Sequence, residues 1–338
     1  MKKILVCAAI CMAAGLFVWA EGAKESGEKF PSKPINVVVH SAAGGGSDVW
    51  ARKVSALMEK EMGVKFVVSN KPGGNGGLAA NFVWNQPHDG YTVLGASESA
   101  MTYVVNGAFD KNASVWDWLI SGGSPGVVAV LKDSPYNTFD DLVAAARAKP
   151  ETVSISNAGI GKLWHLKIDM IKKYSNVPFK HSPYTGSAPA IVALLSKEVD
   201  AVSCSAGEIA PYIESGDARA LVMTENEPFE FKKGEKIPAV TEKFPELGKY
   251  LPMSQFLTLM YPSDVPQNAK AAFEKAFAAI MKSKDMKDFI REQRAVEYNK
   301  MGEAGRTMAV EMEKKFSWFT VDLGLAKVDP AKAGIARP

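Results

Sequence analysis

The sequence predicts an α/β protein built as two lobes, each with a sheet whose strands lead into helices. Three observations favour this class. Apolar, β-branched runs of strand length alternate with segments that are apolar at helical spacing. Glycine-rich turns join several of these strands to the helices that follow. The pattern restarts part-way along a chain of 338 residues, about twice the length of a typical domain.

The first strand-to-helix unit contains the most informative turn. Residues 35–39 form an apolar, β-branched run, and apolar residues recur at helical spacing from Trp50 to Met62. The turn between them, residues 40–48, has three successive glycines that let a ligand approach the backbone, and a helix N-terminus favours an anion. We therefore expect an anion site here, with a carboxylate meeting bare backbone at Gly45. The alternative is a turn that serves packing alone, with Asp48 capping the helix.

Two more units complete the first lobe. A strand at residues 65–69 leads into a second glycine-rich turn, residues 70–77, and a strand at residues 91–96 ends beside residues 97–99. Alternating strands and helices predict a parallel sheet, in which ligands bind at the carboxyl ends of the strands. The turn at residues 40–48 and these two segments should therefore share one edge of the sheet.

A Gly/Ser/Pro cluster at residues 121–126 marks a lobe boundary, after which the pattern begins again. A strand at residues 153–156 leads into a turn at residues 157–162, so the second lobe repeats the device of the first. Thr138 is expected to cap a helix. The other expected elements are strands at 127–131, 199–203, 219–223 and 256–261, and helices at 142–148, 163–174, 188–197, 208–214, 266–282 and 302–319.

Residues 1–20 are predicted to be a secretory signal peptide. Lys2 and Lys3 precede an apolar run, and a small-residue cleavage site ends at Ala20. A membrane anchor is the alternative, but the run is short for a span and a charged segment follows at once. Residues 21–30 are expected to be a flexible leader, and the mature protein to be periplasmic.

Charge and cysteine content exclude several classes. Loss of Lys2 and Lys3 from the 40 basic residues leaves 38 against 37 acidic ones, so nucleic acid is not an expected partner. Cys7 and Cys11 would leave with the signal peptide, so Cys204 has no partner for an internal disulfide.

Nucleotide motifs are absent. Gly161 and Lys162 resemble the end of a phosphate loop, but Leu163 follows where Ser or Thr is required and Ser156 stands where the first glycine should be. The dinucleotide fingerprint fails because Val49 occupies its third glycine position. No cofactor is predicted.

Metal and covalent catalysis are not predicted either. His40, His88, His165 and His181 are far apart in the chain without paired ligand spacing, so no metal ligands are assigned. Cys204 is expected to be a small buried apolar residue and His165 a structural or capping residue. No catalytic residue is assigned, and a binding protein is the class that remains.

Six motifs, taken in order, resemble the substrate-binding proteins of tripartite tricarboxylate transporters, the Bug family. They are residues 31–35, 42–48, 70–77, 89–92, 165–166 and 183–189, and the resemblance runs from about residue 31 to 319. It implies a type II periplasmic binding fold, or Venus flytrap, that holds a carboxylic acid between two lobes and delivers it to integral-membrane transporter subunits. We expect a discontinuous first lobe, residues 31–122 plus 252–338, and a second lobe of residues 123–251.

The resemblance also implies site residues. The two carboxylate-gripping turns and the positions lining the cleft correspond to Ala42, Ala43, Gly44, Gly45, Gly46, Ser47 and Asp48, to Asn157, Ala158, Gly159, Ile160 and Gly161, and to Ser97, Tyr184, Thr185, Gly186 and Ser205.

The sequence departs from the family pattern at four positions. His40 replaces a usual proline, Cys204 lies near a position that is often polar, and Glu98 and Glu208 place acids beside the expected cleft. Extra carboxylates suit an amino-bearing ligand better than a plain polyacid. We expect a monomer that binds a small organic carboxylate for transport; the alternatives are a ligand sensor for a signalling partner and an extracytoplasmic enzyme.

Overall fold

The computed structural model describes residues 30–232, 234–251, 253 and 255–338. The predicted signal peptide, and all but the last residue of the predicted leader, lie outside these residues. Phe30, the last residue of the predicted leader, is the first residue that the structure describes. Its ring lies 4.8 Å from the ring of Tyr91 and 5.5 Å from that of Phe273, measured between centroids, so Phe30 is packed onto the first lobe.

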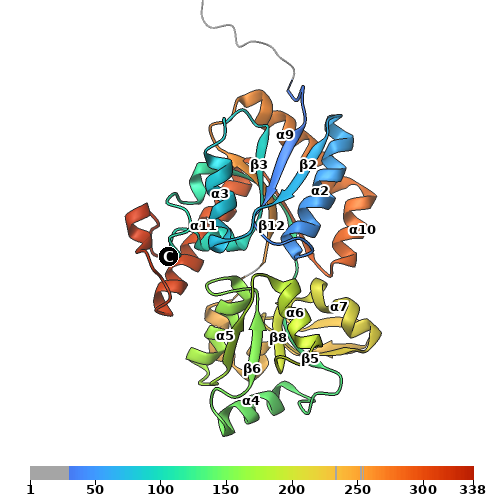
Figure 1. Cartoon of the computed structure of the whole chain (residues 1–338), viewed down its shortest axis with the longest axis vertical. Coiled ribbons are helices and arrows are strands. Elements are labelled where there is room, and N and C mark those ends of the chain that lie inside the picture. The colour runs from blue at the N-terminus through green and yellow to red at the C-terminus, as the bar shows by residue number, and fades with distance from the viewer. Residues whose placement is uncertain (1–29, 233, 252, 254) are drawn as a thin grey trace, which may run out of the picture.

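Two lobes lie one above the other in Figure 1, each built on its own sheet. The upper lobe has six strands in the order β13-β4-β12-β3-β1-β2. β1 pairs in parallel with β2 and β3, as predicted, whereas β12 and β4 add antiparallel pairs. The strands are β1 (Ile35–Val39), β2 (Phe66–Asn70), β3 (Thr92–Ser97), β4 (Trp116–Gly123), β12 (Leu257–Pro262) and β13 (Val296–Lys300).

The lower sheet has five strands in the order β7-β6-β8-β5-β9. β6 pairs in parallel with β7 and β8, and β5 lies antiparallel to β8 and β9. The strands are β5 (Gly126–Leu131), β6 (Ser154–Asn157), β7 (Lys180–Pro183), β8 (Ala201–Ser205) and β9 (Ala218–Met223), and a separate hairpin pairs β10 (Phe229–Lys232) with β11 (Glu235–Ile237).

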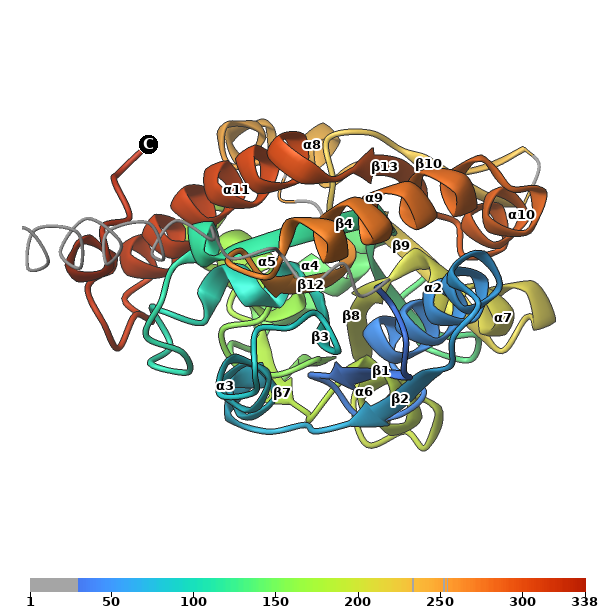
Figure 2. The same ribbon diagram turned by 90° about the horizontal axis from the view of Figure 1, so that it is seen from above.

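Helices cover both sheets, and Figure 2 shows α9, α10 and α11 of the C-terminal third along one side of the molecule. The α-helices are α2 (Gly46–Met62), α3 (Gly77–Trp84), α4 (Phe139–Ala148), α5 (Leu163–Tyr174), α6 (Ser187–Leu195), α7 (Ala206–Ser215), α8 (Val240–Lys243), α9 (Gln267–Lys282), α10 (Lys284–Glu292) and α11 (Gly302–Asp322). Short 3₁₀ turns are η1 (Gly74–Gly76), η2 (Glu98–Thr102), η3 (Ala113–Val115), η4 (Pro245–Lys249) and η5 (Pro330–Ala333).

The helix that follows the first glycine-rich turn, α2, packs onto the first lobe through its apolar face. α2 buries Trp50, Val54 and Met58 against the sheet and α9, in a cluster that includes Phe273. Each such fully buried side chain contributes about 1.5–3 kcal/mol relative to exposure. The N-terminus of α2 is therefore fixed relative to the carboxyl end of β1.

The predicted cap at Thr138 is confirmed. The Thr138 hydroxyl accepts a hydrogen bond from the Asp141 amide at 3.1 Å, and the Asp141 carboxylate accepts one from the Thr138 amide at 2.9 Å. This reciprocal pair satisfies two amides at the start of α4.

The elements that were not predicted from the sequence are β4, β7, β10, β11, α8, α10 and β13. β4 was missed because its end, at Gly122 and Gly123, has the composition of a linker. The whole strand is buried, and a Cβ on Gly123 would lie 1.9 Å from the carbonyl oxygen of Gln255. Glycine is required there because the neighbouring backbone is too close for any side chain.

The chain passes between the sheets in two places. β4 of the first sheet ends two residues before β5 of the second begins, and the chain returns between η4 and β12. The lobe limits given by the sequence, 122/123 and 251/252, remain a prediction. None of the helices in the described part of the chain has the length and apolarity needed to span a membrane.

Candidate functional site

A cavity of about 50 Å³ lies between the lobes, where turns from both sheets meet. The first lobe contributes the β1–α2 turn, the end of β3 and the segment before β12; the second contributes the β6–α5 turn, the β7–α6 turn and α7. The lining residues are His40, Ser41, Ala42, Gly45, Gly46, Ser47, Ser97, Glu98, Ser99, Ala158, Lys162, Trp164, Gly186, Ser187, Ala188, Pro189, Glu208 and Gln255.

A carboxylate already lies at the N-terminus of α2, and it belongs to the protein itself. The Gly46 amide donates a hydrogen bond of 2.9 Å to Oε1 of Glu208, which comes from α7 of the other lobe. The Ser205 hydroxyl donates to Oε2 of Glu208 at 2.6 Å. The anion-accepting amide is thus at Gly46. Gly45, where the sequence analysis placed it, has an ordinary extended backbone (φ −77°) as the N-cap residue.

Asp48 supports the β1–α2 turn and does not line the cavity. Its Oδ2 accepts from the Gly44 amide at 2.9 Å, and its Oδ1 accepts from Arg52 at 2.9 Å and from Asn70 at 2.8 Å. Burial acts to raise the pKa of Asp48, but the hydrogen bonds from Arg52, Gly44 and Asn70 leave it below its usual value. The alternative in which Asp48 caps α2 is wrong in detail, because its carboxylate binds the turn rather than a helix amide.

His40 connects two polar groups under the cavity. One ring nitrogen lies 2.6 Å from the Tyr103 hydroxyl, and the other lies 3.1 Å from the Ser47 hydroxyl. Burial, with a smaller contribution from the charge of Lys162, lowers the pKa of His40 to about 3. A neutral imidazole therefore orients Ser47 and adds no charge to the site.

Lys162 is the cation of the cavity. It is the N-cap residue of α5, and within the described chain no hydrogen bond or ion pair joins its Nζ to a partner. Burial lowers the pKa of Lys162, whereas the nearby Glu98 carboxyl raises it. A partly buried ammonium without a partner favours the entry of an anion that can pair with it.

Glu98 presents a carboxyl group whose charge is suppressed. The residue is 3% exposed, and its Oε2 has no hydrogen-bond partner among the described residues. Burial, reinforced by the Glu208 charge and opposed by hydrogen bonds and Lys162, raises the pKa of Glu98 to about 8. At neutral pH Glu98 is therefore protonated and can donate a hydrogen bond into the site.

The structure brings the two predicted turns together, but only part of the predicted set faces the cavity. Ala42, Gly45, Gly46, Ser47, Ser97, Ala158 and Gly186 line it, whereas Ala43, Gly44, Asp48, Asn157, Gly159, Ile160, Gly161, Tyr184, Thr185 and Ser205 do not. Ligand contact by any of these residues remains a prediction.

Several of the residues that do not line the cavity shape or join the turns instead. Asn157 is buried, and its Oδ1 accepts a hydrogen bond from the Gly159 amide at 3.1 Å. The Ile160 carbonyl accepts one from Asn75 of the other lobe at 3.2 Å, while its side chain is 58% exposed. Tyr184 turns its hydroxyl to Glu198, whose hydrogen bond raises the pKa of the phenol. The Ser205 hydroxyl caps α7.

Lys162 was not predicted from the sequence to be a site residue. A signal for it was present, because the positive end of the helix dipole disfavours a cation at a helix N-terminus. A lysine immediately before a predicted helix after a glycine-rich turn is electrostatically out of place. An anion bound beside it would offset that unfavourable interaction.

Two other expectations from the sequence have different outcomes. Cys204 is fully buried, and burial raises the pKa of its thiol well above its usual value, which confirms its interpretation as a small buried residue. The argument that the histidines lie far apart is wrong for one pair. His165 and His181 have ring centroids 4.4 Å apart, with Asp169 in contact with both.

Comparison with known sequences identifies the family. Residues 50–317 match the family described as tripartite tricarboxylate transporter family receptor, TctC. A relative from Cupriavidus necator, named "UPF0065 protein in gbd 5'region", is 28% identical over 318 residues, which cover 93% of this chain and 94% of the relative.

Solved structures share the fold. The periplasmic binding protein BugD aligns with a TM-score of 0.78 at 22% identity, covering 88% of this chain and 99% of BugD. MatC from Rhodopseudomonas palustris, solved with malate, aligns with a TM-score of 0.76 at 19% identity. The alignment covers 87% of this chain and all of MatC. An R. palustris protein solved with adipate aligns with a TM-score of 0.75 at 22% identity. The alignment covers 88% of this chain and 99% of that protein.

These likenesses confirm the predicted type II periplasmic binding fold. The family match covers most of the chain. The protein therefore belongs to the tripartite tricarboxylate transporter receptor family of periplasmic solute-binding proteins.

Proposed function

We propose that this receptor captures a small organic carboxylate between its lobes and delivers it to the membrane subunits of a tripartite tricarboxylate transporter. The observation that carries the proposal is Lys162, an ammonium without a partner among the described residues, which lines the same cavity as Gly46. A carboxylate can pair with the ammonium and accept from the amide. Malate and adipate, bound by two proteins of the same fold, are acids of this class.

Binding of such an acid requires the site to change. The cavity of about 50 Å³ has room for only a few water molecules, since one water needs about 10–15 Å³ on the same measure. Glu208 also occupies the Gly46 amide. We therefore infer that the lobes open to admit the ligand, and that its carboxylate replaces Glu208 at Gly46 when they close again. Protonated Glu98 would then donate to the ligand.

Mass spectrometry under native conditions tests the proposal first, because a closed binding protein often keeps its ligand through purification. A co-purified carboxylic acid is expected. Calorimetric titration with malate, adipate and acetate should then show saturable binding of at least one of them. Absence of a retained acid together with no binding of the three probes would contradict the proposal, and so would chemical conversion of a bound acid.

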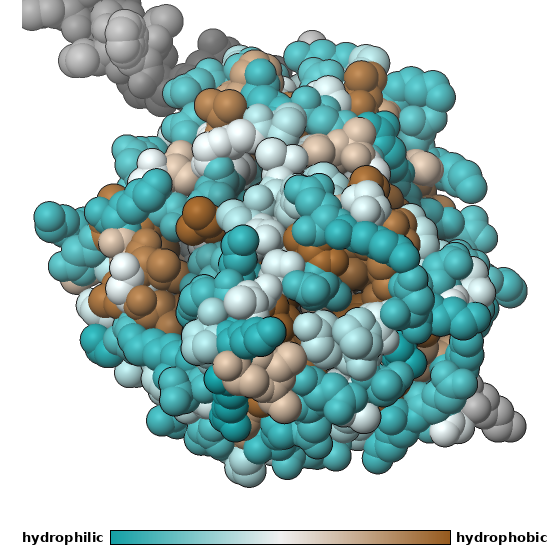
Figure 3. Space-filling model, turned by 60° about the horizontal axis from the view of Figure 1, so that its bottom comes forward, coloured by the Kyte–Doolittle hydropathy of each residue, from teal (hydrophilic) through white to brown (hydrophobic). Residues whose placement is uncertain are grey.

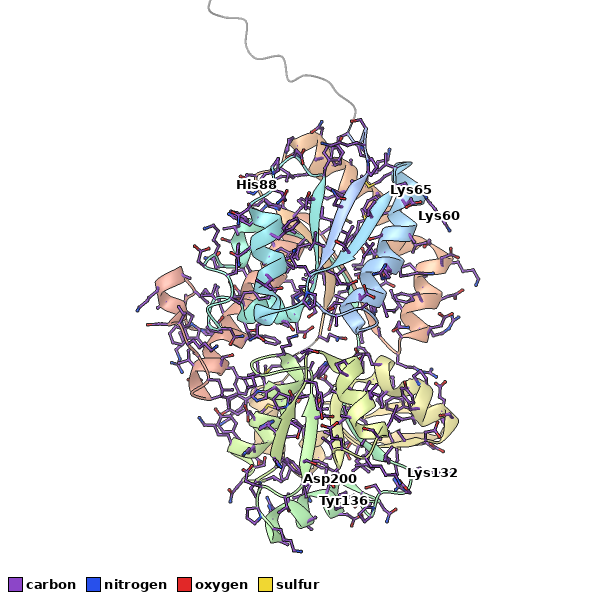
Figure 4. All side chains as sticks on the ribbon, viewed as in Figure 1. Lys60, Lys65, His88, Lys132, Tyr136 and Asp200 are labelled. Atoms are coloured by element: carbon purple, nitrogen blue, oxygen red, sulfur yellow. The ribbon has the colours of Figure 1, made fainter. Side chains whose placement is uncertain are left out.

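The role of Lys162 has a matched control. Lys162→Met removes the cation and should weaken carboxylate binding by about 1–3 kcal/mol, roughly tenfold to a hundredfold. Lys132→Met removes an exposed lysine of the same lobe, which Figure 4 places at the far end from the cleft. It should leave the affinity unchanged. Equal affinities of the two variants would exclude Lys162 as the carboxylate partner.

Delivery to a permease is tested in cells. Uptake of the identified acid should stop when the gene for this protein is deleted and return with the wild-type gene, but not with Lys162→Met. Normal uptake in the deletion strain, together with loss of a signalling response to the same acid, would favour the sensor alternative.

A further inference from the structure

We propose that His165, Asp169 and His181 bind one divalent transition-metal ion, represented here by Zn²⁺, at a site in the second lobe apart from the carboxylate cavity. None of the three residues lines that cavity. Their ligand atoms all lie within 4.8 Å of one another.

Two elements bring the cluster together. His165 and Asp169 are four residues apart on α5, so they lie on the same face of the helix. His181 is on β7, the edge strand of the second sheet. Oδ2 of Asp169 lies 3.2 Å from Nδ1 of His165, and Oδ1 lies 2.6 Å from Nε2 of His181. Both imidazoles therefore direct a nitrogen toward one carboxylate.

These distances suit a shared ion. Zn–N and Zn–O bonds of about 2.0–2.2 Å at tetrahedral angles place neighbouring ligand atoms about 3.3 Å apart. The two measured separations, 3.2 and 2.6 Å, both lie below that value, so small side-chain rotations that move the ligand atoms apart are enough to admit an ion. Two imidazoles and one carboxylate are ligands that Zn²⁺ and its neighbours prefer, whereas Mg²⁺ prefers oxygen ligands alone. A water molecule would complete the fourth position.

The site is enclosed but can be reached from solvent. The side chain of His165 is 6% exposed, and those of Asp169 and His181 are 16% and 17% exposed. The bound ion would join the first turns of α5 to an edge strand that has a neighbouring strand on one side only. Metal binding should therefore stabilise the second lobe, since an ion that binds only the folded chain shifts the folding equilibrium.

The first experiment measures binding directly. Protein without a histidine tag is freed of metal by dialysis against EDTA and titrated with Zn²⁺ in competition with a chromophoric chelator. One Zn²⁺ per chain is expected, with a melting temperature that rises on adding Zn²⁺, falls again with EDTA and does not respond to Mg²⁺. A stoichiometry of zero at 100 µM free Zn²⁺, roughly the weak end of useful metal affinity, would overturn the proposal.

Variants assign the ligands. His181→Gln and Asp169→Asn should each weaken Zn²⁺ binding by at least about tenfold and remove the zinc-dependent rise in melting temperature. The matched control is His88→Gln. His88 is also paired with a carboxylate, Asp264 at 2.6 Å, but lies in the first lobe away from the cleft (Figure 4). Unchanged Zn²⁺ affinity in both cluster variants, or an equal loss in His88→Gln, would overturn the assignment.

Coordination has a spectroscopic signature as well. Co²⁺ added to the metal-free protein should give visible absorption bands of a nitrogen- and oxygen-bound ion, and excess Zn²⁺ should displace them. The bands should be retained in His88→Gln and missing in His181→Gln. Bands of equal intensity in both variants would exclude the cluster. Circular dichroism of each metal-free variant checks that its fold is intact before any loss is interpreted.

Discussion

Glu208 of α7 accepts a hydrogen bond from the Gly46 amide at the start of α2, 162 residues away and in the other lobe. The helix N-terminus that the sequence analysis assigned to an external anion thus holds an anion of the protein. A Cβ on Gly46 would lie 3.3 Å from the same carboxylate oxygen, so the fit is close. Under the proposed function, a ligand carboxylate would compete with Glu208 for this position.

That competition predicts the effect of Glu208→Gln. A neutral amide binds Gly46 more weakly and does not repel an anion, so affinity for a plain carboxylate should increase by about tenfold, or about 1.4 kcal/mol. Calorimetric titration with the acid that co-purifies measures this. Glu227→Gln, at an exposed position, is the control. A loss of affinity in Glu208→Gln would instead mean that the carboxylate contacts an amino group of the ligand.

Protonation of Glu98 predicts a pH dependence of binding. Because burial raises the pKa of Glu98 to about 8, the group gains a negative charge beside the site as the pH rises through that value. Carboxylate affinity should decrease over the same range. Glu98→Gln keeps a neutral hydrogen-bond donor at the position, so titrations from about pH 6 to about pH 10, two units on each side of the pKa, should show a flatter profile in this variant. Parallel profiles in the two proteins would contradict the assignment.

The raised pKa of Glu313 leads us to expect that the stability of the folded chain depends on pH. Its Oε2 accepts from the Ala113 amide at 2.8 Å, but burial is the larger effect and raises the pKa of Glu313 to about 8. Below about pH 4.5 the group is protonated in the folded and the unfolded chain alike. Between that pH and 8 the folded chain binds more protons than the unfolded one, so stability decreases as the pH rises, by at most about 1.4 kcal/mol per unit.

Glu313→Gln should remove this contribution, because the amide stays neutral and can still accept from Ala113. Urea unfolding at several pH values between 5 and 8 compares the two proteins. The stability of the variant relative to wild type should increase with pH. A difference that does not change with pH would show that Glu313 is ionised in the folded protein.

Most elements could be predicted because their apolar pattern depends only on local sequence. β1 and α2 have strong periodicities, and the structure reproduces the predicted strand at residues 35–39. β4 could not be recognised, because its glycines are required by packing against Gln255, a residue far away in the chain.

The two turns of the candidate site could be predicted from the sequence, but the contacts between side chains and backbone at the site could not. Glycine-rich turns after strands are visible in the sequence, but Glu208 reaches Gly46 only because the lobes meet. Likewise, His181 comes from a different element than His165 and Asp169, so the spacing of histidines along the chain cannot show the contact among them. Figure 3 shows a largely hydrophilic face on which apolar side chains gather in separate patches.

The central claim is that a ligand carboxylate binds the amide at Gly46, and one pair of variants tests it most directly. Gly46→Ala places a methyl group 3.3 Å from the carboxylate oxygen that the Gly46 amide binds, which is closer than an ordinary contact. In Gly45→Ala the methyl group would meet the Ala42 carbonyl at 3.5 Å and the Ser41 hydroxyl at 4.0 Å, which are ordinary contacts. Calorimetry with the identified acid should show a loss of at least about tenfold in Gly46→Ala and a much smaller change in Gly45→Ala. Wild-type affinity in Gly46→Ala would contradict the claim.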